Sequence, residues 1–363
     1  MRALMLTMDF PPTRGGIQTM CREILARASR TEFTVVAPRD EGWLSVDGGI
    51  RARVRRVPSI APGRRGFVPA IAWAARDEAR RADVVLAMHT MAAPGALLPK
   101  RAPVVVATHG GEFRSPRIRR VARLVLPRAT HVIANSRFTR SEAVRLGADP
   151  MHTTVLPVGA PEAQHVEPER VEALRARLGG GRIVLSVARL AEHKGQQTLI
   201  RALRDLPADV RAVLVGEGPE RARLEEAARR EGVADRVAFA GIVPDEDLPA
   251  YFAAADVFAL LSVESRAGVE GGGIALLEAC AYGTPIVAAR SGGIPETISD
   301  DLNGLLVSPE DPANTARAID KILDDGALAR RLGGAARTLA AGERSWAAFV
   351  ERLEQLMEAV EQR

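Results

Sequence analysis

The sequence predicts an α/β protein built from two doubly wound parallel-sheet domains. Apolar runs of strand length alternate with amphipathic helical stretches, and this alternation occurs twice, interrupted once near the middle of the chain. The strand segments are continuously apolar, as expected where helices cover both faces of a parallel sheet. At 363 residues the chain is long for one domain and sufficient for two.

The first half contains five strand segments, at least three of which are followed by helical stretches. The strands are LMLTM (4–8), FTVVA (33–37), DVVLAM (83–88), APVVVAT (102–108) and THVIA (130–134), and helices are expected at 17–28, 69–81 and 137–146. The second half repeats the scheme. Its strands are RIVLSVA (182–188), VRAVLVG (210–216), RVAFAG (236–241), DVFALL (256–261), TPIVAA (284–289) and NGLLV (303–307).

Three prolines in PVGAPEAQHVEP (157–168) interrupt the pattern and place the domain boundary there. We expect an N-terminal domain over 1–165 and a C-terminal domain over 166–344. The remaining segment, 345–363, has the apolar stripe of a helix and is expected to pack back on the first domain. Ligands of such sheets bind at the carboxyl ends of the strands, so we expect the chemistry between the two domains.

Composition excludes several classes of protein. Two cysteines, Cys21 and Cys280, cannot form a disulfide framework and favour a reducing compartment. The first apolar run stops at Asp9, unlike a signal peptide, and no run of about 18 apolar residues occurs. We therefore expect a cytoplasmic chain, or one that contacts the inner face of a membrane peripherally.

The charge is divided unevenly along the chain. Residues 1–165 contain 26 Lys and Arg against 13 Asp and Glu, a net charge of +13, whereas the remainder carries −8. Such asymmetry suggests an anionic partner for the first half, although a solvated arginine-rich surface would look the same. Aromatic residues make up only 4%, and no nucleic-acid-binding motif is present, so a membrane surface or phosphorylated small molecules fit better.

Glycine turns follow four of the predicted strands. They are RGGIQT with Gly15 and Gly16, VGEGPE with Gly216, VEGGGIALLEA with residues 271–273, and SGGIPE at 291–296. A glycine turn before a helix lets backbone N–H groups approach an anion. Each turn alone could be structural, but four in one chain point to a phosphate-bearing ligand.

Charged side chains stand beside these turns. Arg189 and Lys194 follow strand 182–188 in one loop, where a guanidinium fork and an ammonium could hold one phosphate group. Glu270 and Glu278 flank the glycine triplet and a helix expected to begin near Gly273. Carboxylates beside a diphosphate are tolerable if they accept hydrogen bonds from hydroxyls of a ribose and a sugar. The pattern therefore indicates a nucleotide sugar.

These motifs together resemble the retaining glycosyltransferases of family 4. The resemblance rests on RGGIQT, THGGEF, SVARLAEHKG, VGEGP, EGGGIALLEACAYGTPIVA and SGGIPE, and it runs along nearly the whole chain. It implies the GT-B arrangement, in which two Rossmann-like domains face each other across a cleft. The segments DFPPTRGGIQ, THGGE and VEGGGI most resemble the phosphatidylinositol mannosyltransferase branch.

The resemblance also implies roles for residues on the donor side. Arg189 and Lys194 would hold the diphosphate, Glu278 the ribose and Glu270 the transferred sugar. The backbone N–H groups of Gly271, Gly272, Gly273 and Ile274 would assist, and Gly216 would lie near the nucleoside. Position 272 is glycine where the family usually has a large apolar residue, which suggests a differently shaped sugar pocket. The linker has Val158 where the family often has Asn.

On the acceptor side the resemblance implies fewer residues. Gly15 and Gly16 would shape the diphosphate and acceptor region, and His109 would contact the donor sugar or the acceptor, unless it is a core histidine. Glu112, Ser136 and Glu296 also match family positions.

The implied reaction moves a hexosyl group from a nucleotide diphosphate to a hydroxyl with retention of configuration. GDP-mannose is the favoured donor and a UDP-sugar the alternative. Arg189, Lys194 and helix-start amides would stabilise the leaving group. No cofactor is expected, and no metal, because no His or Cys cluster with metal-binding spacing is evident. The acceptor could be a polyol, a glycoside or a lipid-linked molecule. Two other functions stay open: a nucleotide-sugar epimerase of the same fold and a non-catalytic nucleotide-sugar-binding subunit.

The segment RSPRIRRVARLVLPR (114–128) combines six arginines with apolar residues at helical spacing. Such a stretch could lie on an anionic membrane and bring the enzyme to a lipid acceptor. Alternatively, it is a surface helix whose apolar stripe packs on the first domain.

Overall fold

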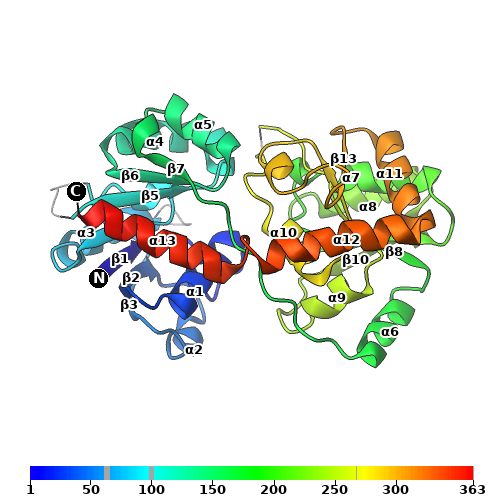
Figure 1. Cartoon of the computed structure of the whole chain (residues 1–363), viewed down its shortest axis with the longest axis horizontal. Coiled ribbons are helices and arrows are strands. Elements are labelled where there is room, and N and C mark those ends of the chain that lie inside the picture. Colours follow the sequence, from blue (N-terminus) through cyan, green and yellow to red (C-terminus); the bar gives the residue numbers. More distant parts are fainter. Residues whose placement is uncertain (61–65, 98–101, 267, 363) are drawn as a thin grey trace. The chain divides into compact units, whose positions relative to one another are not determined.

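The computed structural model describes residues 1–60, 66–97, 102–266 and 268–362. Packing divides the chain into a first unit, Met1–Val158 with Trp346–Arg363, and a second unit, Gly159–Ser345 (Figure 1). The division falls after Val158, a few residues before the boundary expected from the proline-rich segment. Each unit contains one parallel sheet with helices on both faces, so the predicted fold class is confirmed.

The first unit contains a seven-stranded parallel sheet in the order β3-β2-β1-β4-β5-β6-β7. Its strands are β1 (Arg2–Leu6), β2 (Glu32–Pro38), β3 (Arg53–Val57), β4 (Val84–Ala87), β5 (Val104–Thr108), β6 (His131–Ala134) and β7 (Thr153–Val155). In the centre of the sheet Leu4 pairs with Thr34 on one side and with Val85 on the other.

The two edge strands, β3 and β7, were not predicted. The sequence of β3 is RVRRV, and β7 has only the three residues TTV. An edge strand is paired on one side only and needs fewer apolar residues than a central strand. In β3 the arginine side chains are used locally, since Arg56 is 7% exposed and its guanidinium donates to the carbonyls of Pro38 at 2.8 Å and Pro11 at 2.6 Å.

Helices cover both faces of this sheet. They are α1 (Gly16–Arg27), α2 (Trp43–Asp47), α3 (Phe67–Glu78), α4 (Pro116–Val125), α5 (Arg137–Arg145) and α13 (Trp346–Glu361), with short 3-10 turns η2 (Thr90–Ala92), η3 (Gly111–Arg114), η4 (Leu126–Arg128) and η5 (Pro150–His152). Alternate residues of β4 face opposite sides: Val85 and Ala87 join the core under α3, α4 and α5, whereas Leu86 contributes to a pocket under α1 and α13.

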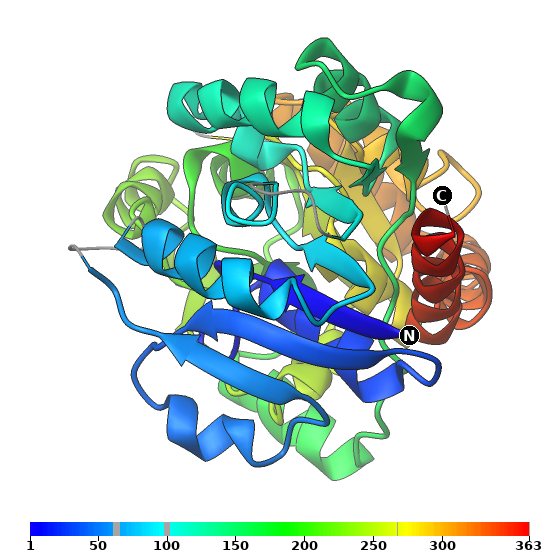
Figure 2. The same ribbon diagram turned by 90° about the vertical axis from the view of Figure 1, so that its left-hand side faces the viewer.

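The C-terminal helix α13 packs against α1, and Figures 1 and 2 show it (red) running along the unit that contains β1 (blue). Glu354 of α13 is 2% exposed. Its carboxylate accepts the Arg30 backbone N–H at 2.9 Å and lies 3.7 Å from the Arg30 guanidinium, which also approaches Glu358 at 3.3 Å. This buried carboxylate therefore fixes the last helix to the turn between α1 and β2.

The second unit contains a six-stranded parallel sheet in the order β10-β9-β8-β11-β12-β13. Its strands are β8 (Arg182–Val187), β9 (Val210–Val215), β10 (Val237–Gly241), β11 (Val257–Leu260), β12 (Ile286–Ala289) and β13 (Leu305–Val307). The helices are α6 (Pro168–Arg177), α7 (Gln196–Ala202), α8 (Arg221–Arg230), α9 (Leu248–Ala254), α10 (Ile274–Tyr282), α11 (Pro312–Asp324) and α12 (Gly326–Ala341). Short 3-10 turns complete it: η6 (Glu192–Lys194), η7 (Leu203–Asp205), η8 (Ala234–Arg236) and η9 (Ile294–Glu296).

Each sheet has a topological switch point. The first strand of each unit pairs on one side with the next strand in the chain and on the other with a strand reached after a longer connection: β1 lies between β2 and β4, and β8 lies between β9 and β11. Loops that leave the carboxyl ends of such neighbouring strands diverge, and ligands of parallel sheets bind in the crevice between them. The loops after β1 and β4, and after β8 and β11, are therefore where sites are expected.

Candidate functional site

In the second unit the loops after β8 and β11 bring Lys194 and Glu270 together. The Lys194 Nζ lies 2.5 Å from one carboxylate oxygen of Glu270, and the other oxygen accepts the Gly273 backbone N–H at 3.0 Å. The two side chains are only 20% and 12% exposed. The sequence placed both residues at the carboxyl edge of the sheet but did not predict that they pair.

This pairing keeps Glu270 ionised. Burial, the largest single influence, would raise the pKa of Glu270. The charge of Lys194, its hydrogen bond and the N–H of Gly273 together outweigh burial, so the pKa of Glu270 lies below its ordinary value. The site therefore contains a partly buried carboxylate that is charged at neutral pH.

Arg189, in the same loop as Lys194, has a different environment. Its side chain is exposed, and among the described residues no carboxylate lies within 4.0 Å of its guanidinium. Its carbonyl accepts a hydrogen bond from the Gln196 side chain at 3.1 Å, which fixes the loop backbone. Arg189 is thus a cation at the switch point that a bound anion could use.

His193 lies between these two cations in the sequence. Burial, the largest cause, lowers its pKa; Lys194 and Arg189 lower it further, and Glu270 opposes them. A Cβ at Gly268 would meet the imidazole at 2.8 Å, so the ring packs directly on that glycine. The ring is therefore neutral near pH 7 and adds no third positive charge.

The glycine triplet ends at the start of α10. Gly273 has the left-handed conformation, φ 61°, and is the N-cap of this nine-residue helix, in agreement with the predicted helix start. Gly271 is buried, whereas Gly272 and Ile274 are half-buried. Glu278, five residues after Gly273, is also half-buried and raises the pKa of Tyr282, although burial of that phenol is the larger cause.

Two other glycine turns have packing roles in the structure. A Cβ at Gly216 would lie 2.1 Å from the Ala188 carbonyl oxygen, and the Gly216 N–H donates to the Gly241 carbonyl at 2.8 Å. Gly292 has φ +54°, and a Cβ there would lie 2.1 Å from the Glu270 carbonyl oxygen. These glycines allow neighbouring loops to approach each other, and Gly292 supports the loop that carries Glu270.

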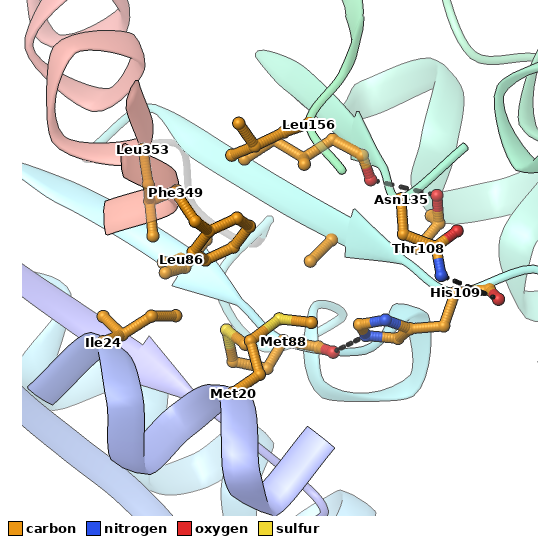
Figure 3. A pocket seen from close by; sticks show the side chains of 12 residues that line it. Met20, Ile24, Leu86, Met88, Thr108, His109, Asn135, Leu156, Phe349 and Leu353 are labelled. Atoms are coloured by element: carbon orange, nitrogen blue, oxygen red, sulfur yellow. Dashed lines mark hydrogen bonds between the residues drawn. The ribbon is translucent and has the colours of Figure 1, made fainter. Parts of the chain in front are cut away.

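In the first unit the loops after β4 and β5 bring two histidines to the carboxyl edge. The His109 Nε2 lies 2.7 Å from the Met88 carbonyl oxygen, as Figure 3 shows, and its backbone N–H donates to the Glu112 carboxylate at 2.9 Å. A carbonyl oxygen can only accept, so Nε2 carries a proton and Nδ1 is the other hydrogen-bonding group of the ring. The second carboxylate oxygen of Glu112 is buried with no hydrogen-bond partner among the described residues.

The second histidine, His89, was not predicted. Its Nδ1 accepts the Met91 backbone N–H at 3.0 Å, so the hydrogen of the neutral ring is on Nε2. Burial is the largest influence on His89 and lowers its pKa. The nearby His109 lowers this pKa further, whereas the charges of Glu112 and Asp9 raise it. The sequence signal was available: His89 follows the strand segment DVVLAM directly, as His109 follows APVVVAT.

An apolar pocket lies beside His109 (Figure 3). It is lined mainly by apolar side chains from α1, α13 and the β4 region, among them Met20, Ile24, Leu86, Met88, Phe349 and Leu353. Thr108 and Asn135 add polar atoms next to His109, and the Asn135 side chain donates to the His109 carbonyl at 3.4 Å. The histidine therefore stands at the junction of an apolar and a polar region.

The remaining predicted residues of the first unit lie at helix starts. Gly15 and Gly16 are exposed at the beginning of α1, a 12-residue helix. Ser136 is 2% exposed and caps α5, because its hydroxyl accepts the Thr139 N–H at 3.1 Å and bonds the Thr139 hydroxyl at 3.0 Å. The structure thus gives Ser136 a capping role.

The predicted residue Glu296 lies in the second unit. Its backbone carbonyl accepts a hydrogen bond from the Arg344 guanidinium at 2.9 Å.

The arginine-rich segment 114–128 forms η3, α4 and η4. Ala122 and Val125 are buried in the core, as the surface-helix alternative predicts, whereas Leu124 is 62% exposed. Arg117, Arg120 and Arg123 share the exposed face with Leu124. In the described parts of the chain none of these three arginines has a carboxylate within 4.0 Å, so the outer face of α4 is basic and unneutralised.

No helix among the described residues combines the length and the apolar character that crossing a bilayer requires. No group of three or more His, Cys, Asp or Glu side chains in the same residues is arranged to hold a metal ion.

Comparisons with known proteins agree with the arrangement of the fold. The model of Glycosyltransferase Family 4 matches residues 14–164, and that of Glycosyl transferases group 1 matches residues 173–339. The GDP-mannose-dependent alpha-(1-6)-phosphatidylinositol monomannoside mannosyltransferase of Mycobacterium tuberculosis is 36% identical over 379 residues, covering 97% of each chain. The enzyme of the same name from Mycolicibacterium smegmatis is 35% identical over 372 residues, covering 98% of this chain and 97% of the relative.

A solved structure shows the same fold. The HepE protein of Anabaena, in complex with UDP and glucose, superposes with a TM-score of 0.84 at 24% identity and covers 99% of this chain and 100% of its own. At this identity the likeness concerns the fold alone.

Proposed function

The chain belongs to glycosyltransferase family 4 and is a nucleotide-sugar-dependent glycosyltransferase, and we propose that it transfers mannose from GDP-mannose to an inositol-containing acceptor with retention of configuration. The observation that carries the donor proposal is the likeness along nearly the whole chain to GDP-mannose-dependent enzymes. The names of those relatives also support a mannosylated phosphatidylinositol as the acceptor.

We propose that the second unit binds the donor at its switch point. Lys194 and Arg189 supply two positive charges, and the amides at the start of α10 supply hydrogen-bond donors for the diphosphate. Glu278, in the second turn of α10, would accept the ribose hydroxyls, and Glu270 the hydroxyls of the sugar.

We propose that the first unit binds hydroxyl groups. His89 offers a neutral imidazole and His109 a second ring, and the unpartnered oxygen of Glu112 is an acceptor beside them. Gly15 and Gly16 are exposed at the start of α1, and their backbone amides would bind an anionic group of a substrate.

In the proposed reaction the bond from the sugar's anomeric carbon to the diphosphate breaks as the acceptor oxygen bonds to the same face. The acceptor proton passes to the departing phosphate oxygen. Arg189, Lys194 and the α10 amides would stabilise the charge that develops on the leaving diphosphate, without a metal ion. Transfer in excess EDTA at an unchanged rate would support this; loss of transfer, restored by a divalent ion, would contradict it.

The experiment that tests the function measures binding and transfer with one protein. Thermal denaturation against UDP-, GDP- and ADP-sugars identifies the donor, since a ligand at 100 times its dissociation constant adds about 2.7 kcal/mol. Radiolabelled mannose from GDP-mannose is then offered to phosphatidylinositol mannoside, phosphatidylinositol and free inositol. Label on the mannoside supports the proposal. A shift with UDP-sugars alone would replace the donor, and label on free inositol alone would replace the acceptor.

We also propose a peripheral contact with an anionic membrane through α4. The exposed Leu124 surrounded by Arg117, Arg120 and Arg123 is the pattern of a helix that lies in the headgroup region. Helix α3 packs on the same face of the sheet and presents Trp73, 71% exposed, a residue type enriched at membrane interfaces.

Vesicle sedimentation tests this contact. Wild type should bind vesicles containing phosphatidylinositol at low salt. The combined variant R117Q/R120Q/R123Q should bind them with at least tenfold lower affinity, because each arginine near an anionic surface contributes about 1 kcal/mol of binding free energy. The matched control is R223Q/R229Q/R230Q on α8, which removes three exposed arginines of the second unit. Equal loss in both variants would show a non-specific charge effect instead.

A further inference from the structure

A carboxylate of the chain itself contacts the groups that an anion would bind. One carboxylate oxygen of Glu270 accepts a hydrogen bond from the Lys194 ammonium at 2.5 Å. The other accepts one from the Gly273 N–H at the start of α10 at 3.0 Å. An ammonium and a helix-start amide are the groups that a phosphate uses. A diphosphate that binds both groups therefore competes with Glu270 for them.

We infer that Glu270 makes the donor site discriminate against the nucleoside diphosphate product and promotes its release. This inference rests on the proposed donor site. A nucleoside diphosphate without a sugar that binds Lys194 separates Glu270 from its counter-ion and places a second anion close to this partly buried carboxylate. Both effects make the binding free energy less favourable. An intact donor avoids most of this cost, because the hydroxyls of its sugar can donate to the displaced carboxylate.

This exchange of partners by Glu270 is reversed after the sugar has been transferred. Once the sugar has left with the acceptor, Glu270 loses those hydroxyl donors, and Lys194 and the Gly273 N–H remain as its partners. Re-forming the ion pair withdraws one of the cations that hold the diphosphate. Discrimination through an unpaired charge is a general way to reject a ligand that otherwise fits.

The backbone around Glu270 is fixed independently of this side chain. Its carbonyl oxygen accepts the Gly293 N–H at 2.9 Å, and Gly292 packs directly against the same carbonyl. A glutamine at position 270 has the same shape, and its single amide oxygen can accept from Gly273 or from Lys194, which donate to different oxygens of Glu270. Glu270→Gln therefore removes the charge and leaves the loop in place.

The test is isothermal titration of GDP and of GDP-mannose into wild type and Glu270→Gln. Removing an opposite charge at this distance changes the affinity of Lys194 for another anion by about tenfold or more. We expect Glu270→Gln to bind GDP about tenfold more tightly and GDP-mannose no more tightly than wild type. Glu278→Gln, which also removes a carboxylate charge from the proposed donor site, should weaken both ligands.

A double variant separates the ion pair from general charge effects. In a Lys194→Met background GDP has no ion pair to break, so adding Glu270→Gln should increase GDP affinity less than it does in wild type, by the repulsion between carboxylate and diphosphate alone. Glu270→Ala, which removes both contacts of the carboxylate, should strengthen GDP binding as Glu270→Gln does and keeps the test valid if one variant does not fold.

The outcomes distinguish this inference from the proposed function. If wild type transfers the sugar but the Glu270 variants bind GDP no more tightly, the inference is overturned and the function stands. Equal strengthening of GDP and GDP-mannose also overturns it, because no discrimination would then depend on Glu270. If wild type binds no nucleotide sugar at all, the proposed function fails and the inference fails with it.

Discussion

The carboxyl edges of the two sheets are equivalent in topology but differ in charge. In the second unit the edge carries ions: Arg189 is exposed, and Lys194 is paired with Glu270. In the first unit the edge carries two histidines, of which His89 is held neutral by burial and by a backbone donor at Nδ1. The same crevice can therefore be adapted to an anion or to neutral hydroxyls by the few residues that follow each strand.

The largest expected effect is on the charged edge. Lys194→Met removes the ammonium proposed to stabilise the leaving diphosphate, and turnover with GDP-mannose should fall by about 10²–10³. The protein should also lose about 1–3 kcal/mol of unfolding free energy, since Glu270 stays in a site only 12% exposed without its partner. Steady-state kinetics and urea denaturation measure the two effects.

Lys321→Met is the control for this prediction, because Lys321 is an exposed lysine near the end of α11. It should change neither turnover nor stability measurably. A Lys194→Met enzyme with more than half of wild-type turnover would show that the charge at this edge is not part of the reaction.

An effect of intermediate size on stability and turnover is expected at Gly292, which supports the loop that carries Glu270. In Gly292→Ala the new Cβ would lie 2.1 Å from the Glu270 carbonyl oxygen, so the loop must shift. We expect a loss of about 2–4 kcal/mol in unfolding free energy, from the left-handed backbone and the overlap together. Turnover should fall as well, because Glu270 moves with its loop.

Gly180→Ala isolates the backbone contribution. Gly180 has a similar φ of +67°, but nothing lies within 4 Å of its added Cβ. It should cost only about 1–2 kcal/mol and leave turnover unchanged. If the two variants lose the same stability, the contact with Glu270 contributes nothing.

Sequence reasoning succeeded where local pattern and topology coincide. The continuous apolar strands, the helix start at Gly273 and the placement of Arg189 and Lys194 after one strand all follow from periodicity and turn chemistry. It missed β3, because three arginines in RVRRV obscure an edge strand that tertiary contacts stabilise. It also missed the pairing of Lys194 with Glu270, since residues 76 positions apart meet only through strand order.

The glycine turns show a further limit. From sequence all four indicated phosphate binding, yet Gly216 and Gly292 are required for the close approach of neighbouring loops. Glycine permits both uses, and only the atoms around it decide between them.

The smallest effect concerns the histidine edge of the first unit and the residue that sequence reasoning missed. His89→Asn keeps an acceptor for the Met91 N–H and removes the titratable ring. The pKa of His89 is lower in the folded protein than the value of about 6.5 expected when unfolded. As the pH falls through about 6.5, His89 therefore binds a proton more readily in the unfolded chain than in the folded one. The unfolding free energy of wild type consequently decreases toward acidic pH.

Urea denaturation at pH 7.5 and 5.5 measures this difference. Wild type should lose about 1 kcal/mol more than His89→Asn over that interval, since one group contributes at most about 1.4 kcal/mol per pH unit. His193, whose pKa is also lowered, is present in both proteins and cancels. His165→Asn is the control, because that side chain is 80% exposed, and it should behave as wild type. If His89→Asn loses as much stability as wild type, His89 is not the neutral group that distinguishes this edge, and the contrast between the two edges would depend on the charged pair alone.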